Sequence, residues 1–245
     1  MGQGEHQHES RQRLDVARRA ADEGDWTGAR AIALEALLDA RQRLDFETMS
    51  GALDVYAHSA ERLVAAAEQA ATGATIIARG ADAPDPLVEG CYLLTPPMIG
   101  ADATNLRNAA WAGGLAVRAL AREPLTRAGK WPVVAGGDVI VRTHVDPPVP
   151  LDRVDAAITK DAYAGPAPLA WFRAALARLG EVALESVRPE DPAAHRVDDL
   201  LEILSALPDE ARVIEALRHA CAEAKTQRAP TLPRRRPVVD DPYSF

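Results

Sequence analysis

The loop that follows Leu94 is the place in this sequence best suited to hold a ligand, because it joins a short apolar strand to a helical pattern over 101–112. In a strand–helix–strand unit, ligands bind beyond the carboxyl ends of the strands, where the amides that start the helix attract anions. The residues that could line such a site are Thr95, Gly100, Thr104, Arg127 and Arg142. The loop has no nucleotide-binding motif, and Asp102 would itself repel an anion. A connection that only packs against the sheet is the alternative.

Two further groups of residues have spacings that could support chemistry. His195, Asp199 and Glu202 are spaced four and three positions apart, so they share one helix face and could ligate a metal ion. A solvated helix face is the alternative. His144 and Asp146 share one face of an expected strand and could act as a catalytic pair, but the sequence names no third group. A pair on the protein surface is the alternative there.

No pattern in the chain predicts a catalytic triad, because no serine stands in a Gly-x-Ser-x-Gly motif. Cys91 and Cys221 lie far apart without a second cysteine nearby, which excludes a zinc knuckle and indicates buried thiols of a reducing compartment. We therefore expect no cofactor.

The polar N-terminus has no apolar segment of a secretory signal, and no apolar stretch approaches the roughly 20 residues of a membrane span. These features predict a cytoplasmic protein.

The end of the sequence carries a possible recognition motif. Pro230, Pro233 and Arg235 fit the proline-rich pattern that SH3 domains bind as an extended helix. Phe245, with Tyr243 two positions before it, is typical of chain ends that PDZ-type pockets take up as an added strand. A solvated basic tail is the alternative, because this stretch is rich in proline and has no hydrophobic period.

Composition and charge bound the class of protein that could carry these candidates. Alanine accounts for 49 of the 245 residues, and it favours helices that approach one another closely. We expect an α+β, mostly helical fold, with N- and C-terminal helical hairpins around a small mixed β-sheet. The net charge is −8, and an acidic chain repels both nucleic acid and anionic lipid. Neither is therefore an expected partner.

Changes of pattern divide the chain into consecutive segments. Residues 1–11 are polar and predict disorder, whereas 12–73 predicts a helical hairpin region. Closely spaced glycines and prolines indicate a small α/β segment over 74–148. The region 149–224 is helical by its apolar spacing, and 225–245 is an expected disordered tail rich in Pro and Arg.

The N-terminal hairpin resembles a tetratricopeptide repeat. Ala17 stands where that family has a small residue in its first helix, and Gly24–Trp26 matches its Gly-Asp-aromatic turn. Ala29, Ala33 and Ala36 stand at the small or packing positions of the second helix. The resemblance implies one helical hairpin of the kind that presents a surface to a protein partner. A generic helical hairpin is the alternative.

A shift of 34 residues, the family period, tests for a second repeat. It maps Ala17 onto Gly51 and Ala33 onto Ala67, but it maps the turn onto Ser59–Glu61, which is not a turn sequence. The aromatic residue of the second helix and the closing proline of the family are missing. The resemblance thus covers one repeat, in the first quarter of the chain.

The segment 74–148 predicts the element order β-α-β-β-β. Strands at Cys91–Leu94 and 115–120 flank a helix and are expected to pair in parallel. Runs at 131–135 and 138–145 flank Gly136–Gly137, which predicts a hairpin with a two-residue turn and positive φ at the glycines.

The function that these patterns favour is non-catalytic. We expect an intracellular interaction or scaffold protein that presents helical hairpins to a protein partner. The alternative is a small-molecule or anion-binding regulatory module, or an enzyme of unknown class, with its site at the loop after Leu94. A cavity at that loop lined by converging arginines would favour the alternative, and a filled loop would favour the scaffold.

Overall fold

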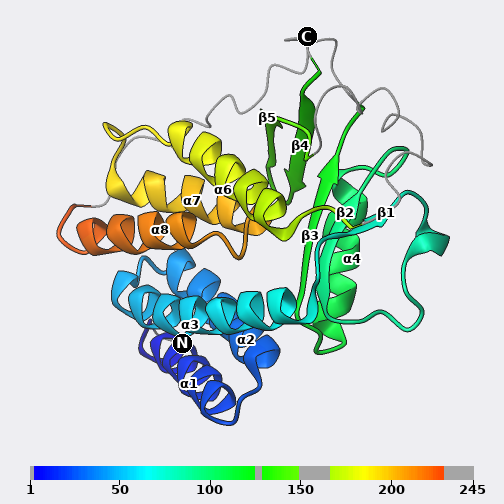
Figure 1. Cartoon of the computed structure of the whole chain (residues 1–245). Coiled ribbons are helices and arrows are strands. Elements are labelled where there is room, and N and C mark those ends of the chain that lie inside the picture. Colours follow the sequence, from blue (N-terminus) through cyan, green and yellow to red (C-terminus); the bar gives the residue numbers. More distant parts are fainter. Residues whose placement is uncertain (1–2, 125–128, 149–165, 229–245) are drawn as a thin grey trace. The chain divides into compact units, whose positions relative to one another are not determined.

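The computed structural model describes residues 3–124, 129–148 and 166–228, with side chains from residue 9 onward. These residues form seven α-helices and one five-stranded mixed sheet, which confirms the expected α+β, mostly helical fold (Figure 1). None of the described helices is long and apolar enough to cross a membrane. The chain groups into two compact units. Their described residues are 3–63, 187–201 and 211–228 for the helical unit, and 64–124, 129–148, 166–186 and 202–210 for the sheet unit.

The helical unit is built from two complete hairpin helices, one further helix and the first parts of two others. Its elements are α1 (Gln3–Asp22), α2 (Trp26–Gln42), the first part of α3 (Phe46–Ala70), the first part of α7 (Ala193–Ala206) and α8 (Ala211–Ala224). Segments distant in sequence thus share one unit, which the division into consecutive segments did not anticipate.

The turn between α1 and α2 has the form that the sequence predicts. Gly24 has a φ of 83°, which glycine adopts without strain, and the Asp25 carboxylate caps α2 by accepting the Gly28 N–H at 2.9 Å. Ala17 and Ala33 are fully buried, so their small side chains allow close helix contact. Helix α1 begins at Gln3, however, inside the stretch 1–11 for which we expected disorder. That stretch has no proline, and its Gln, Glu and Arg residues are good helix formers.

Helix α3 shows why the family resemblance stops after one repeat. It runs without interruption from Phe46 to Ala70, through Ser59–Glu61, where a second turn would have to lie. The small residues found by the 34-residue shift therefore line one long helix rather than a second hairpin.

A second turn, between α2 and α3, depends on an unusual backbone conformation at Leu44. This residue has a φ of 58°, and glycine more often takes that position after a helix. The Leu44 N–H donates to the Arg41 carbonyl at 3.0 Å, and the Asp45 N–H donates to the Ala40 carbonyl at 2.9 Å. Asp45 then caps α3 by accepting the Thr48 N–H at 3.0 Å and the Thr48 hydroxyl at 2.8 Å. These bonds hold the turn in place despite the strain.

Ion pairs connect the helical segments that are distant in sequence. Arg41 on α2 donates its Nε and Nη2 to the two carboxylate oxygens of Asp198 on α7, at 2.6 and 2.7 Å. Such a two-pronged contact fixes orientation as well as distance. Lys225, which follows α8, lies 2.7 Å from the Glu47 carboxylate at the start of α3. The start of α3, the start of α7 and the end of α8 are thereby held near one another.

The sheet unit contains five strands in the order β1-β2-β3-β4-β5. They are β1 (Thr75–Ile77), β2 (Gly90–Leu94), β3 (Val117–Arg122), β4 (Trp131–Gly136) and β5 (Ile140–Val145). β1, β2 and β3 pair in parallel, and the remaining pairs are antiparallel. The expected β-α-β-β-β order is therefore present, with α4 (Gly100–Ala112) as its helix and Gly113–Gly114 as the helix stop. β1 was not expected, because three residues are too few to show a period.

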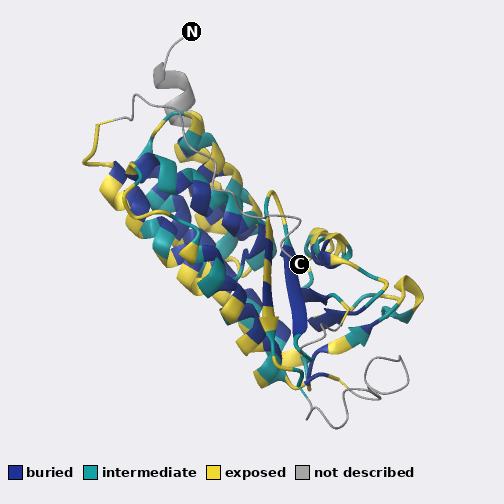
Figure 2. Cartoon of the chain, turned by 90° about the horizontal axis from the view of Figure 1, so that it is seen from above, coloured by how far each residue is buried: buried dark blue, intermediate teal, exposed yellow. Residues whose placement is uncertain are grey.

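Helix α4 and α6 (Leu169–Glu185) pack against the sheet. Tyr92, Leu94 and Val117 form a buried cluster with Ala103 and Ala110 of α4. β2 and β3 are buried along their whole length, whereas β1 and β5 also carry exposed residues, and Figure 2 shows both buried and exposed stretches in the strands. On α6, Trp171 meets Trp131 of β4 edge to face, with ring centroids 5.5 Å apart. This tryptophan contact joins a helix to the sheet.

The strands β3 and β4 separate after two residue pairs, and another segment fills the space. They pair only at Ala121–Val134 and Arg122–Val133, although each strand has six residues. At the open end, Arg107 of α4 donates to the carbonyls of Ser205 and Ala206, each at 3.2 Å. The Asp138 N–H donates to the Ser205 hydroxyl at 2.7 Å. The end of α7 thus belongs to the architecture of the sheet unit.

This packing corrects the expected role of the double glycine. β4 and β5 form the predicted hairpin, but Gly136 is the last residue of β4, the loop is 137–139, and neither glycine has a positive φ. Instead, a Cβ built on Gly137 would lie 2.5 Å from the backbone nitrogen of Ala206. Gly137 is therefore required by the close approach of another segment and not by the geometry of its own turn.

We predict that Gly137→Ala lowers the free energy of unfolding by about 2 kcal/mol, because the added methyl group overlaps fixed backbone. Urea denaturation measures this change. Gly80→Ala is the matched control, since nothing lies within 4 Å of a Cβ at Gly80 and its φ is not positive. We expect that control to change stability by less than about 0.5 kcal/mol. Equal effects of the two substitutions would contradict the packing argument.

Candidate functional site

The chain's own polar groups occupy the loop after Leu94, where the sequence placed its first candidate site. The Thr95 N–H donates to the Ile77 carbonyl at 2.8 Å, and the Thr104 hydroxyl donates to the Gly136 carbonyl at 2.7 Å. Asp102 accepts the Ile99 N–H at 2.8 Å, so a carboxylate already lies at the start of α4. A Cβ on Gly100 would lie 3.0 Å from the Val134 side chain. The structure brings Gly100 and Thr104 to β4 as packing groups.

Of the two arginines expected near this loop, Arg142 is paired elsewhere. Arg142 on β5 forms an ion pair with Glu123 at 2.7 Å. Arg122 is buried against the ring of Trp131, with its guanidinium carbon 4.5 Å from the ring centroid, and burial lowers the pKa of Arg122. Arg127 lies outside the described residues.

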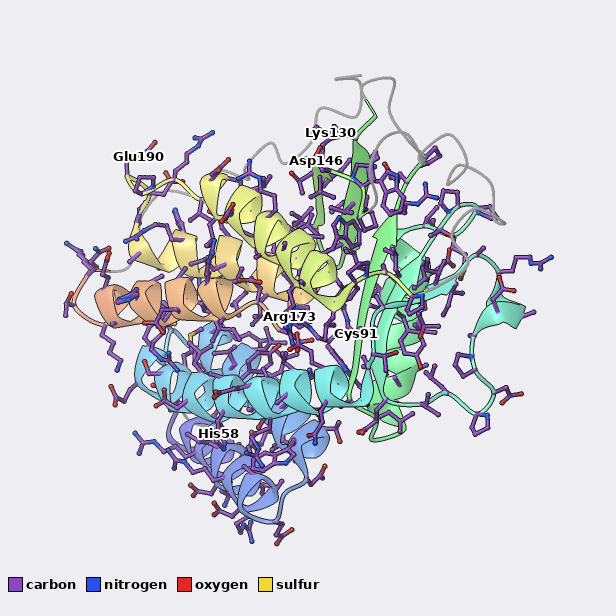
Figure 3. The ribbon with its side chains drawn as sticks, viewed as in Figure 1. His58, Cys91, Lys130, Asp146, Arg173 and Glu190 are labelled. Atoms are coloured by element: carbon purple, nitrogen blue, oxygen red, sulfur yellow. The ribbon has the colours of Figure 1, made fainter. Side chains whose placement is uncertain are left out.

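The metal-ligand and catalytic candidates are likewise dispersed. His195, Asp199 and Glu202 lie on α7, but no three His, Cys, Asp or Glu side chains in the described part of the chain are arranged to hold a metal ion. On β5 and the residue that follows it, Asp146 forms an ion pair with Lys130 rather than with His144 (Figure 3). The tail candidates Pro230, Pro233, Arg235 and Phe245 lie outside the described residues.

The two thiols lie in surroundings that suppress their reactivity. Burial raises the pKa of Cys91 to about 11, although the charge of Arg118 opposes the shift. Burial likewise raises the pKa of Cys221 to about 12, against the charges of Lys225 and Arg41. Both cysteines are free in the structure. Because the thiolate is the nucleophile, neither cysteine fits a catalytic role.

A partly buried charge cluster links α3, β3 and α6 in the sheet unit. The Glu68 carboxylate lies 2.6 Å from Arg118 on β3 and 2.8 Å from Arg173 on α6, which Figure 3 labels beside Cys91. Burial alone raises the pKa of Glu68, but the hydrogen bonds and charges of Arg173 and Arg118 outweigh it, so the pKa lies below its ordinary value of 4.5. Each carboxylate oxygen has a cationic partner. The cluster therefore fits a structural role.

A cavity of about 550 Å³ in the helical unit could hold a ligand. We call it the basic cavity. Its walls come from the α2–α3 turn, the start of α7 and the end of α8, and the lining residues are Arg43, Leu44, Asp45, Phe46, Glu47, Pro192, Ala194, Ala224, Lys225, Gln227 and Arg228. Ligand sites commonly have volumes of about 300–1,000 Å³. The basic cavity is thus large enough for a small organic molecule.

The acidic groups of the basic cavity are already engaged. Asp45 caps α3 through Thr48, and Glu47 pairs with Lys225 at 2.7 Å. Arg43 differs, since its Nε and Nη2 are buried and have no hydrogen-bond acceptor. The nearest carboxylate oxygen, on Asp39, lies 3.9 Å from Nη2, and the same oxygen forms an ion pair with Arg13. Arg43 therefore lines the cavity while two of its guanidinium nitrogens, buried behind the cavity surface, have no acceptor.

A second enclosed space, in the sheet unit, has a volume of about 20 Å³. Its lining includes Arg107, Arg118, Asp209 and Glu210. Such a volume accepts one water molecule and no organic ligand. This space completes the packing between β3 and the end of α7.

Sequence reasoning missed the basic cavity because its lining comes from three separate segments. Arg43 and Lys225 appeared only as charges at the ends of helical patterns. One local signal was present: Leu44-Asp45 stands where a helix ends, and a hydrophobic residue there instead of glycine marks a constrained turn.

We predict that neither thiol of the native protein reacts with a maleimide at pH 7.5 within the time in which a free thiol reacts fully. Burial and the raised pKa values both slow the reaction. Mass spectrometry should show two labels once the chain is unfolded in urea. Rapid labelling of the native protein, or no labels after unfolding, would contradict this prediction.

We predict that Glu68→Gln lowers the free energy of unfolding at pH 7 by about 2–3 kcal/mol, since it leaves the buried Arg118 without its anion. The pKa of Glu68 is lowered in the folded state, so its stabilisation is present above pH 4.5 and is lost as the pH falls through the folded-state pKa. The difference in free energy of unfolding between the unmodified protein and Glu68→Gln should therefore become smaller in acid. Urea denaturation at several pH values from 7 to 3 measures this difference, and Glu61→Gln, at an exposed position on α3, is the control. A difference independent of pH would contradict the pairing.

Comparison with family models, curated proteins and solved structures finds no match to this chain. The tetratricopeptide resemblance is therefore a likeness of one hairpin, and the functional argument depends on the geometry of the chain itself.

Proposed function

We propose that the protein is a non-catalytic binding protein whose helical unit holds a ligand in the basic cavity. The observation that carries this proposal is the cavity itself, about 550 Å³ in volume and bounded by three segments that ion pairs hold together. The lining contains no serine, cysteine or histidine that could serve as a nucleophile or base. Its shape and chemistry thus suit binding rather than catalysis.

This proposal moves the expected ligand site from the sheet unit to the helical unit. The loop after Leu94 is filled by internal hydrogen bonds, which removes the geometric support for a site there. We retain the proposal of a cytoplasmic protein without a nucleic-acid partner, supported by the two buried free cysteines and the net charge of −8.

A protein partner on the α1–α2 hairpin is the second candidate function. Val16 on α1 and Leu38 on α2 are large apolar side chains that are 40% and 45% exposed. Such side chains favour a contact surface of the scaffold type. Binding there would not depend on the basic cavity.

Blocking the cavity tests the main proposal. In Glu47→Cys the new thiol sits on an exposed side chain of the cavity lining, so a bulky maleimide should label it while the two native thiols stay buried. We predict that small molecules from a panel of neutral, cationic and anionic probes raise the melting temperature of the unmodified protein and of unlabelled Glu47→Cys, but not of Glu47→Cys once it is labelled. A ligand at a hundred times its Kd adds about 2.7 kcal/mol of stability.

Glu61→Cys carrying the same label is the matched control, because Glu61 is an exposed residue of the same helix outside the cavity. It should respond to the probes as the unmodified protein does. A panel in which no probe stabilises the protein, or in which both labelled variants respond alike, would overturn the proposal. Binding of a protein partner to both labelled variants would favour the hairpin surface instead.

A further inference from the structure

We infer that the ligand of the basic cavity is a small organic molecule that carries an oxyanion, either a carboxylate or a phosphate. This inference depends on the proposed function, because it names the chemistry of the same site. Arg43, Lys225 and Arg228 line the cavity, against Asp45 and Glu47. Lys225 and Glu47 pair with each other and Asp45 caps α3, whereas Arg228 has no ion-pair partner among the described residues. The unused charge of the cavity is positive.

Arg43 supplies the group that an oxyanion would satisfy. A guanidinium presents a planar fork of N–H donors that matches carboxylate and phosphate oxygens. Two of its nitrogens, Nε and Nη2, are buried without an acceptor, and a buried donor without a partner costs about 1–3 kcal/mol. The Arg43 side chain still retains about a quarter of its exposure. A small rotation into the cavity would bring these donors to a ligand.

One helix start adds to the same preference. Ala194, which lines the cavity, lies in the first turn of α7, where backbone N–H groups favour an anion. The start of α3 does not contribute, because the Asp45 carboxylate already caps it.

The rest of the lining indicates an organic ligand rather than a bare ion. Leu44, Phe46 and Pro192 supply apolar surface opposite the charged groups. A volume of about 550 Å³ far exceeds the space for one water-sized group. A molecule with an apolar body and one oxyanion would satisfy both parts of the wall.

Four probes with the same ring and different charges test the inference: phenyl phosphate, benzoate, benzyl alcohol and benzylamine. Isothermal titration with the full chain should show binding of phenyl phosphate or benzoate at least tenfold tighter than of the other two. The comparison of phenyl phosphate with benzoate identifies which oxyanion the site prefers. Binding should weaken severalfold when NaCl rises from about 0.05 to 0.5 M, because salt screens exposed charges.

Arg43→Gln should weaken anion binding at least tenfold. The matched control, Arg11→Gln on α1, removes the same charge from an exposed position outside the cavity and should change binding less than twofold. Equal effects of the two substitutions would overturn the inference, as would a failure of both anions to bind. Benzyl alcohol or benzylamine binding best, and only while the cavity is unblocked, would overturn the anion inference and leave the proposed function intact.

Discussion

The need of each buried arginine for an acceptor organises much of this structure. Arg41 donates hydrogen bonds to both carboxylate oxygens of Asp198, and Arg118 donates one to the Glu68 carboxylate. Arg107 donates to two carbonyls at the end of α7. Each of these contacts ties together segments that are distant in sequence, because the charge cannot be left unsatisfied in a medium of low polarity. Arg43 differs in degree, since two of its buried nitrogens have no acceptor, whereas Arg107 and Arg118 each leave only Nε without one.

The fold was predictable where local patterns decide it. Alanine spacing and the Gly24–Asp25 turn predicted the first hairpin, and the apolar runs around the double glycine predicted the β4–β5 hairpin. The parallel pairing of β2 and β3 followed from the short helix between them. The role of Gly137 could not be predicted, because it depends on Ser205 and Ala206, which approach it only in the folded chain. The contact of Gly137 with this distant segment, and not the local turn geometry, determines why a glycine is needed there.

The candidate site was less accessible to sequence reasoning for a related reason. The loop after Leu94 had the residue types of an anion site, but whether a polar group is free depends on its partners, and Asp102 and Gly136 supply those partners here. The basic cavity is the reverse case, in which the structure forms a site that no motif in the sequence predicts. Its lining residues show no motif, and they become a site only because the Arg41–Asp198 and Lys225–Glu47 pairs hold three segments together.

An acidic protein with a site for anions is not a contradiction, because charge acts locally in salt solution. The net charge of −8 describes the whole chain, whereas screening reduces interactions between exposed charges beyond about 8 Å at physiological ionic strength. The cations of the cavity that are not already paired with a lining acid are Arg43 and Arg228, because Lys225 pairs with Glu47. The acidic remainder slows the approach of an anion and disfavours polyanions such as nucleic acid, which cannot enter the cavity without facing that surface. Net charge and local lining together therefore favour a small anion over a large one.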